Sequence, residues 1–277
     1  HELNALGALH VTAAAGEAGI SRLVMGSTTL VYGARGDNPN FLSEEHPLRP
    51  DPQDRFVRDF VEAESFARAH QKRHPESKVT VLRFAPLTAP DVRDYRQRLF
   101  ESPYNMTLMG YDPLLQAMSP DDAVEAIRLV LDRHETRGVF NIAPDGVLPL
   151  SAFHLLYATL AVPLPHPLAY AAQEAAWLAG VGLMPGVHSD YFRYLCVADN
   201  QKAKRVLGFE PNLSTLEAVL ATVRVRRGKG RLVSFDELEE VAHRAVYRFS
   251  KGLQKEAAAR KLQAAQKNDT GSRRAAQ

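Results

Sequence analysis

The sequence predicts an α/β fold, because short apolar runs typical of buried strands alternate with segments of helical periodicity. The first apolar run ends in small polar residues, as expected where a strand delivers hydroxyl groups into a crevice. The predicted strands are Arg22–Met25, Lys78–Phe84 and Gly138–Ala143, and the predicted helices are Asn4–Gly19 and the segments that open at Phe56 and Ser119.

The composition is that of an ordinary globular protein, with 45% hydrophobic residues, 24% charged residues and a formal net charge of +2. The single cysteine, Cys196, excludes an internal disulfide, and we expect a small apolar side chain in a protein of the reducing cytoplasm. The most apolar stretch, Leu168–Met184, is interrupted by polar residues and glycines, which argues against a transmembrane helix.

A strong helix start stands at Ser119, whose hydroxyl can cap a helix that continues with Pro120 and two acidic residues. Val124, Ile127 and Leu131 follow at helical spacing, so we expect them to form the buried face of this helix.

The stretch Gly26–Gly33 and the helix Phe56–Glu64 carry the main functional signal. A strand, the hydroxyls of Ser27 and Thr28, a Val-Tyr-Gly turn and then this helix resemble the extended short-chain dehydrogenase/reductases, in their NAD-dependent epimerase/dehydratase branch. The resemblance implies the C-terminal part of a Rossmann-like doubly wound parallel sheet. It also implies NAD or NADP as cofactor and a nucleotide-sugar-like ligand.

The helix departs from that family at its two reactive positions, where Tyr-x-x-x-Lys is replaced by Phe56 and Phe60. Residues four apart share one face of a helix, so the family's lysine lies beside the phenol and lowers its pKa. Phenylalanine offers neither a proton nor a charge, so this pair cannot transfer protons. We expect both rings to be core aromatics, which is compatible with an apolar wall on a surviving cofactor pocket.

At the family's other site positions this chain keeps one catalytic hydroxyl and two residues expected to contact the cofactor. Thr28 occupies the hydroxyl position, and the resemblance places Ser27 and Phe84 on the nicotinamide side. Pro86 and Ala89 replace an asparagine and a glycine that shape the family's substrate side. No metal site is predicted: His70 and His74 are spaced four apart, but the intervening residues lack the glutamate of a His-Glu-x-x-His motif.

The resemblance covers residues 1–222, with a substrate lobe formed mainly by 91–120 and 144–222. It begins at a helix that is mid-sheet in the family, and no G-x-G-x-x-G phosphate-binding loop occurs in the sequence. We therefore expect an N-terminally truncated chain that lacks this loop. The sequence leaves homo-oligomerisation open.

The segment 223–277 has a different composition, with 14 Lys and Arg against 6 Asp and Glu, a net charge of +8. Residues 1–222 carry a net charge of −6 by the same count. We expect a basic linker over Arg224–Arg231, a helix opening at Ser234, and a disordered end. Docking on the acidic body, an acidic partner, a membrane surface and a nucleic acid are the alternatives for this tail, although no interleaved aromatic residues support base stacking.

Three functions are consistent with these features. The preferred one is a degenerate NAD(P)-binding member of the epimerase/dehydratase family, a pseudoenzyme that binds a cofactor or ligand without the standard hydride transfer. The second is an active sugar-nucleotide epimerase, dehydratase or oxidoreductase whose acid/base is Asp59, Glu62 or Tyr32. The third is an interaction protein that acts through the basic tail.

Overall fold

The computed structural model describes residues 2–227. The tail predictions therefore lie outside the described residues from position 228 onward. Helix α8 (Thr215–Arg227) runs through the first four residues of the predicted basic linker, so Arg224–Arg227 are helical and that part of the prediction is wrong. No helix in the part of the chain that the structure describes is long and apolar enough to cross a membrane.

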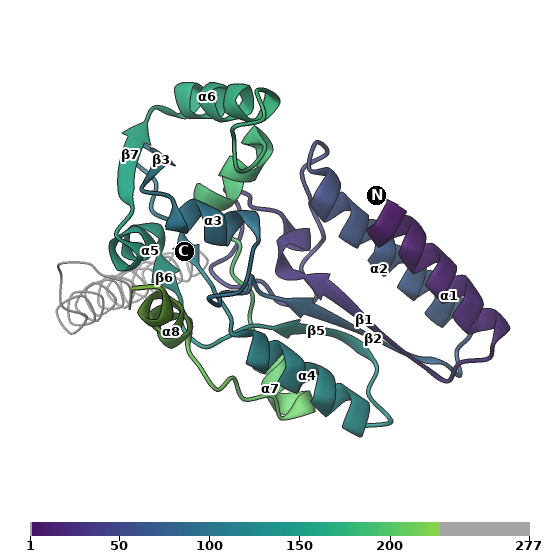
Figure 1. The fold of residues 1–277 in the computed structure, drawn as a ribbon. Helices are drawn as coiled ribbons and strands as arrows, with labels where there is room; N and C mark the ends of the chain where they lie inside the picture. Colours follow the sequence, from purple (N-terminus) through teal and green to yellow (C-terminus); the bar gives the residue numbers. More distant parts are fainter. Residues whose placement is uncertain (1, 228–277) are drawn as a thin grey trace, which may run out of the picture. The chain divides into compact units, whose positions relative to one another are not determined.

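The central element is a three-stranded parallel sheet of order β1-β2-β5, formed by Arg22–Thr28, Lys78–Phe84 and Gly138–Ile142. All three predicted strands are confirmed, and β1 extends to include both hydroxyl residues that follow Met25. The register pairs Thr28 with Phe84 and Phe84 with Ile142, so the three carboxyl ends lie at one edge of the sheet (Figure 1).

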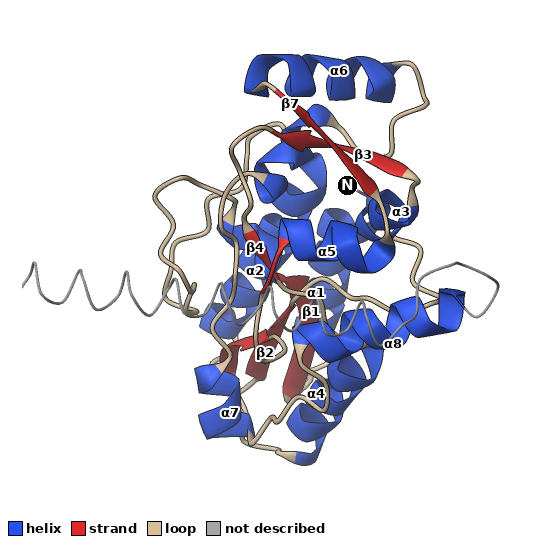
Figure 2. Cartoon of the chain, turned by 90° about the vertical axis from the view of Figure 1, so that its left-hand side faces the viewer, coloured by secondary structure: helices blue, strands red, loops and turns tan. Residues whose placement is uncertain are grey.

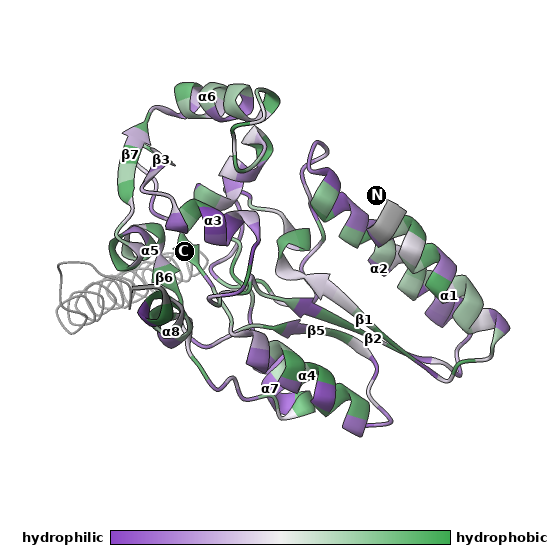
Figure 3. Cartoon of the chain, in the orientation of Figure 1, coloured by the Kyte–Doolittle hydropathy of each residue, from purple (hydrophilic) through white to green (hydrophobic). Residues whose placement is uncertain are grey.

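Helices cover both faces of this sheet (Figure 1). A π-helical turn (Glu2–Leu6), α1 (Gly7–Glu17) and α2 (Arg55–Arg73) lie on one side, and α4 (Pro120–Asp132) and α7 (Gln201–Leu207) lie on the other. Strand β2, between its two neighbours, is apolar over most of its length (Figure 3). This pattern is typical of strands that are buried on both faces.

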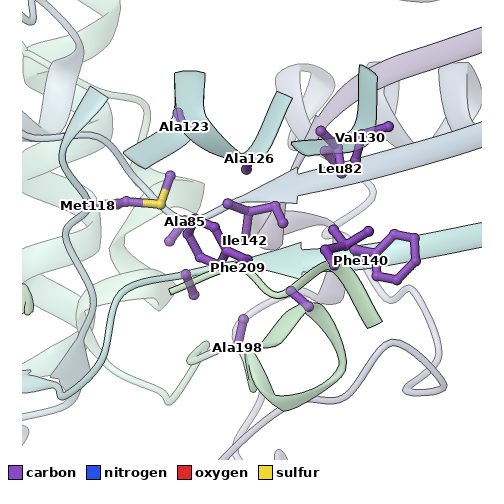
Figure 4. Close-up of a cluster of buried hydrophobic side chains, with 13 residues drawn as sticks. Leu82, Ala85, Met118, Ala123, Ala126, Val130, Phe140, Ile142, Ala198 and Phe209 are labelled. Atoms are coloured by element: carbon purple, nitrogen blue, oxygen red, sulfur yellow. The ribbon is translucent and has the colours of Figure 1, made fainter. Parts of the chain in front are cut away.

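The main core lies between the sheet and the α4–α7 layer (Figure 4). Leu82 and Phe140 from the strands pack there with Phe209, which follows α7, and all three are almost completely buried. Small residues of α4 close the layer from above: Ala123, Ala126 and Val130.

A second lobe stands beyond the carboxyl edge of the sheet (Figure 2). Its two small sheets pair β3 with β7 in parallel and β4 with β6 antiparallel. The elements are α3 (Tyr95–Glu101), β3 (Tyr104–Leu108), β4 (Leu114–Leu115), β6 (Leu148–Pro149), α5 (Leu150–Tyr157), β7 (Leu160–Leu164), α6 (His166–Leu178) and the 3-10 helix η3 (Gly186–Phe192). They fall within 91–120 and 144–222, the segments assigned to the lobe by prediction.

Helix α4 starts as predicted but buries the opposite face from the one expected. Ser119 caps it by accepting a hydrogen bond from the Asp121 amide at 3.3 Å. Val124, Ile127 and Leu131, the predicted buried stripe, are exposed by 65%, 38% and 51% of their surfaces. The sheet instead contacts the face with the small side chains, which lets the helix approach closely.

Two valines on α4 test which face is buried. Val130→Ala removes two methyl groups from a fully buried site, so we expect the free energy of unfolding to fall by about 1–3 kcal/mol. Val124→Ala makes the same side-chain change on the exposed face of the same helix. It should change the free energy of unfolding by less than about 0.5 kcal/mol. Urea denaturation of both variants makes the comparison, and an equal or reversed effect would contradict this packing.

Candidate functional site

The predicted hydroxyl and cofactor residues lie at the carboxyl edge of the sheet, where β1 passes into the 3-10 helix η2 (Thr29–Tyr32). Thr28 is half-buried, caps η2 by accepting from the Leu30 amide at 3.3 Å, and pairs in register with half-buried Phe84. Ser27 is buried and donates to Glu64. The structure thus brings Thr28 and Phe84 together and turns Ser27 towards helix α2.

The turn after η2 requires a glycine. Gly33 has a φ of +72°, and a Cβ atom there would lie 2.1 Å from the carbonyl oxygen of Arg49. No L side chain fits both constraints, because the backbone angle is strained and the neighbouring atom is main chain. Gly33 thereby fixes the path of the loop that leads to helix α2.

Phe56 and Phe60 lie on one face of α2, with ring centroids 5.1 Å apart in an edge-to-face arrangement. Phe60 packs against a buried cluster that includes Val57 and Tyr191, which agrees with the expected core position. Phe56 does not: 48% of its surface is exposed, so the prediction that it is a core aromatic is wrong. It sits in the first turn of α2 and lines a cavity, whose lining does not include Ser27, Thr28 or Phe84 among the described residues.

A fully bonded ionic network is buried beside these residues. Arg83 on β2 donates from Nε to Glu64 Oε1 at 2.9 Å and from Nη2 to Oε2 at 2.7 Å. The Ser27 hydroxyl donates to the same carboxylate at 2.7 Å. Arg83 Nη1 also donates to the Tyr32 hydroxyl at 2.8 Å, and Tyr32 donates to Asn141 Oδ1 at 2.7 Å.

This network determines what its members can do chemically. Burial raises the pKa of Tyr32 to about 12, although Arg83 and Asn141 act in the opposite direction. The phenol therefore stays protonated at neutral pH and is poorly suited to the acid/base role considered for it. Of the other two candidates, Asp59 is buried on α2 and Glu62 is exposed.

A cavity of about 730 Å³ opens at the start of α2. Its walls come from that helix terminus, from α3, from α6 and η3, and from the segment that joins these two. They include Phe56, Tyr95 and Trp177, and apolar side chains from Leu178 to Val187. Neither Asp59 nor Glu62 is among the described residues that line it.

Sequence reasoning missed a buried acid–imidazole pair in the wall of this cavity. Asp54 caps α2, with Oδ1 accepting from the Val57 amide at 3.1 Å, and His188 Nε2 lies 3.2 Å from the same Oδ1. Both residues line the cavity and are more than nine-tenths buried. The helix start gave a signal for Asp54, but His188 is distant in the chain and has no local motif.

A metal centre is not supported by the described residues. Among residues 2–227, no group of three or more His, Cys, Asp or Glu side chains could hold a metal ion. His70 and His74 stack with ring centroids 4.8 Å apart, and His70 Nε2 is 3.2 Å from the Ser77 hydroxyl.

The three-stranded parallel sheet, its two helical layers and the lobe at its carboxyl edge define a Rossmann-like dinucleotide-fold protein. The family model of the NAD dependent epimerase/dehydratase family matches residues 1–143, and the chain belongs to this family. Uncharacterised proteins of Mycobacterium bovis and Mycobacterium tuberculosis are 29% identical over 248 residues, 84% of this chain. The chain spans 65% of the length of these curated relatives.

Solved structures of sugar-nucleotide enzymes share the fold. MoeE5, in complex with UDP-glucuronic acid and NAD, superposes with a TM-score of 0.61 at 21% identity, over 81% of this chain and 71% of its own. The dTDP-glucose 4,6-dehydratase DesIV of Streptomyces venezuelae, with NAD bound, gives 0.60 at 20% identity, over 82% and 66%. The UDP-glucose 4-epimerase of Thermotoga maritima gives 0.59 at 18%, over 82% and 70%.

Removing one partner of the Glu64–Arg83 pair should destabilise the protein strongly. Glu64→Gln leaves a buried guanidinium without its counter-charge, so we expect a loss of about 3–5 kcal/mol in the free energy of unfolding. Glu64→Leu with Arg83→Met removes both charges and should cost less than the single change. The control is Glu125→Gln in the exposed pair with Arg128, which should have no measurable effect in urea denaturation. Equal losses at positions 64 and 125 would contradict a special dependence of stability on the buried pair.

The Tyr32 phenol should make stability fall at alkaline pH. Its folded pKa of about 12 exceeds the ordinary phenol value of ~10, so the unfolded chain ionises first. The contribution of the protonated phenol to the free energy of unfolding is complete below the pKa of the unfolded chain. It is lost as the pH rises towards the pKa of the folded protein. Relative to Tyr32→Phe, the wild type should therefore lose about 1.4 kcal/mol per pH unit above pH ~10. Parallel urea curves from pH ~8 to ~11 measure this, and a constant difference would count against it.

Proposed function

We propose that this protein is a NAD(P)-binding member of its family that does not carry out the family's standard hydride-transfer catalysis. The observation that carries the proposal is the pair of phenyl rings at positions 56 and 60. They share the face of α2 on which a phenol and an ammonium would cooperate, and neither ring can give or take a proton.

The residues at the sheet edge fit a nicotinamide cofactor only in part. Half-buried Thr28 pairs in register with half-buried Phe84, and these two would contact the nicotinamide side. The cofactor supplies hydride chemistry when it is bound. The Ser27 hydroxyl donates to Glu64 in the buried network. Ser27 would therefore help to position the end of β1 and would not bond the cofactor through its hydroxyl.

The rival function, catalysis with Asp59, Glu62 or Tyr32 as acid/base, has less support. Tyr32 is completely buried, with a raised pKa and hydrogen bonds to Arg83 and Asn141. Asp59 and Glu62 belong to the same helix as Phe56 but do not line the described cavity beside it. A nucleotide sugar remains the proposed ligand class, because MoeE5 and the Thermotoga epimerase are named with such molecules.

Turnover and cofactor binding together test the proposal. The complete gene product should bind NAD or NADP saturably in calorimetry and show no epimerase, dehydratase or dehydrogenase turnover on UDP-glucose, UDP-glucuronic acid or dTDP-glucose. A positioned acid/base is worth ~10²–10⁴-fold, so Phe56→Tyr with Phe60→Lys should produce measurable turnover above the unmodified protein. Phe56→Tyr alone should produce little, because an unassisted phenol stays protonated at neutral pH.

The control for the double variant is Thr28→Ala in the same background, which should abolish any turnover that is gained. Robust turnover by the unmodified protein, persisting after Thr28→Ala, would overturn the proposal. Absence of NAD and NADP binding would overturn its cofactor part and leave the missing acid/base pair untouched.

A further inference from the structure

Arg96 on α3 is a buried cation without a carboxylate partner among the described residues. Its exposed fraction is 9%. Nε donates to the Tyr95 hydroxyl at 3.1 Å, whereas Nη1 and Nη2 have no acceptor in the part of the chain that the structure describes. The other deeply buried arginine, Arg83, differs in this respect, because each of its three nitrogens donates to Glu64 or Tyr32.

The aromatic residues around Arg96 compensate its charge only in part. A guanidinium does not lose its proton in a protein, so the charge persists and its burial is unfavourable without a counter-charge. The rings of Tyr95, Tyr191 and Phe192 lie 5.9, 5.5 and 5.8 Å from the Arg96 Cζ atom, near the outer limit of a cation–π contact. The rings attract the charge, but the N–H groups of Nη1 and Nη2 still lack acceptors.

The unbonded donors of Arg96 are not sealed inside the protein. Nε of Arg49 and Nε of Arg193 lack both a partner and accessible surface, whereas no nitrogen of Arg96 is in this state. Arg96 lines a small cavity enclosed by α3, α5, η3 and the segments around Leu87 and Gln116. Nη1 and Nη2 therefore keep accessible surface on a residue that borders this cavity.

The lining of this cavity favours an anion. Arg96 is the one charged residue among the described residues that line it, and none of them is an aspartate or a glutamate. The neutral polar side chains are already bonded: Thr88 Oγ1 donates to Gln97 Oε1 at 3.0 Å, and Gln116 pairs with the main chain of Ala198. Aromatic and aliphatic side chains form most of the remaining wall. A cation here would meet an unopposed guanidinium.

The size of the cavity restricts the anion to a very small one. Its volume is about 20 Å³, and a cavity needs ~10–15 Å³ to hold one water molecule. The space therefore admits a single water molecule or a monatomic ion of similar size. A water molecule would accept hydrogen bonds but would leave the charge of Arg96 without a counter-ion, whereas a halide ion supplies both.

We propose that this cavity binds a halide ion such as chloride, held by Nη1 and Nη2 of Arg96. The ion would join α3 of the lobe to the segments that follow β2 and β4, so its binding would stabilise the folded protein. The site goes beyond the proposed function, because it requires neither a sugar nucleotide nor a nicotinamide cofactor.

Chloride should raise the melting temperature of the complete gene product saturably. Sodium chloride or sodium bromide replaces sodium gluconate at one ionic strength, so that the screening of surface charges stays constant. A ligand that binds the folded state alone should raise the melting temperature by about 4–8 °C at ~30 times its Kd. Bromide should act like chloride, because the site recognises charge and size.

Arg96→Met is the matched variant, because methionine keeps an unbranched side chain and removes the charge. It should lose the shift produced by chloride. Arg98→Met, at an exposed position of the same helix, is the control and should keep the shift. An equal shift in the wild type and in folded Arg96→Met would overturn the proposal.

A bromide-soaked crystal of the unmodified protein tests the site even if the variant fails to fold. The expected result is an anomalous-scattering peak in contact with Nη1 or Nη2 of Arg96. A water molecule there without such a peak would overturn the proposal. A peak without a saturable melting shift would show an adventitious ion only and would also overturn it. Cofactor titrations are separate, so failure here and failure of the proposed function are distinguished.

Discussion

The ion pair between Glu64 and Arg83 is the constraint on which the sheet edge depends. Both side chains are almost fully buried, and buried charges are tolerated only when their hydrogen-bonding capacity is satisfied. Satisfying them requires the Ser27 hydroxyl from β1 and the Tyr32 phenol from η2. Helix α2, two strands and η2 are thereby held in one arrangement.

That arrangement uses, in structural hydrogen bonds, polar groups that would otherwise be candidates for acid/base catalysis. The Ser27 hydroxyl and the Tyr32 phenol lie near the positions expected for an active site, yet their bonds make them positioning groups. Of the two phenylalanines on α2, Phe56 lines the cavity, whereas Phe60 packs against the buried cluster with Val57. Unsatisfied polar capacity at this end of the helix lies instead in Asp54 and His188.

Local sequence patterns predicted where helices and strands lie better than they predicted which faces of these elements are buried. Strand β2 was predicted with its observed bounds, because a β-branched run between polar residues depends on nearby sequence alone. The buried face of α4 was predicted wrongly. The prediction rested on the larger apolar side chains, whereas the sheet packs against the face with the small residues around Ala126. Which face packs is decided by the partner surface, and this information lies elsewhere in the chain.

The same limit explains why the acid–imidazole pair could not be predicted. Asp54 has the ordinary place of a helix cap, and an imidazole is brought to it only when the lobe folds over the start of α2. One oxygen, Oδ1, thus serves both a local and a long-range purpose, because it caps the start of α2 and also contacts His188. A helix terminus shared between two lobes couples their positions.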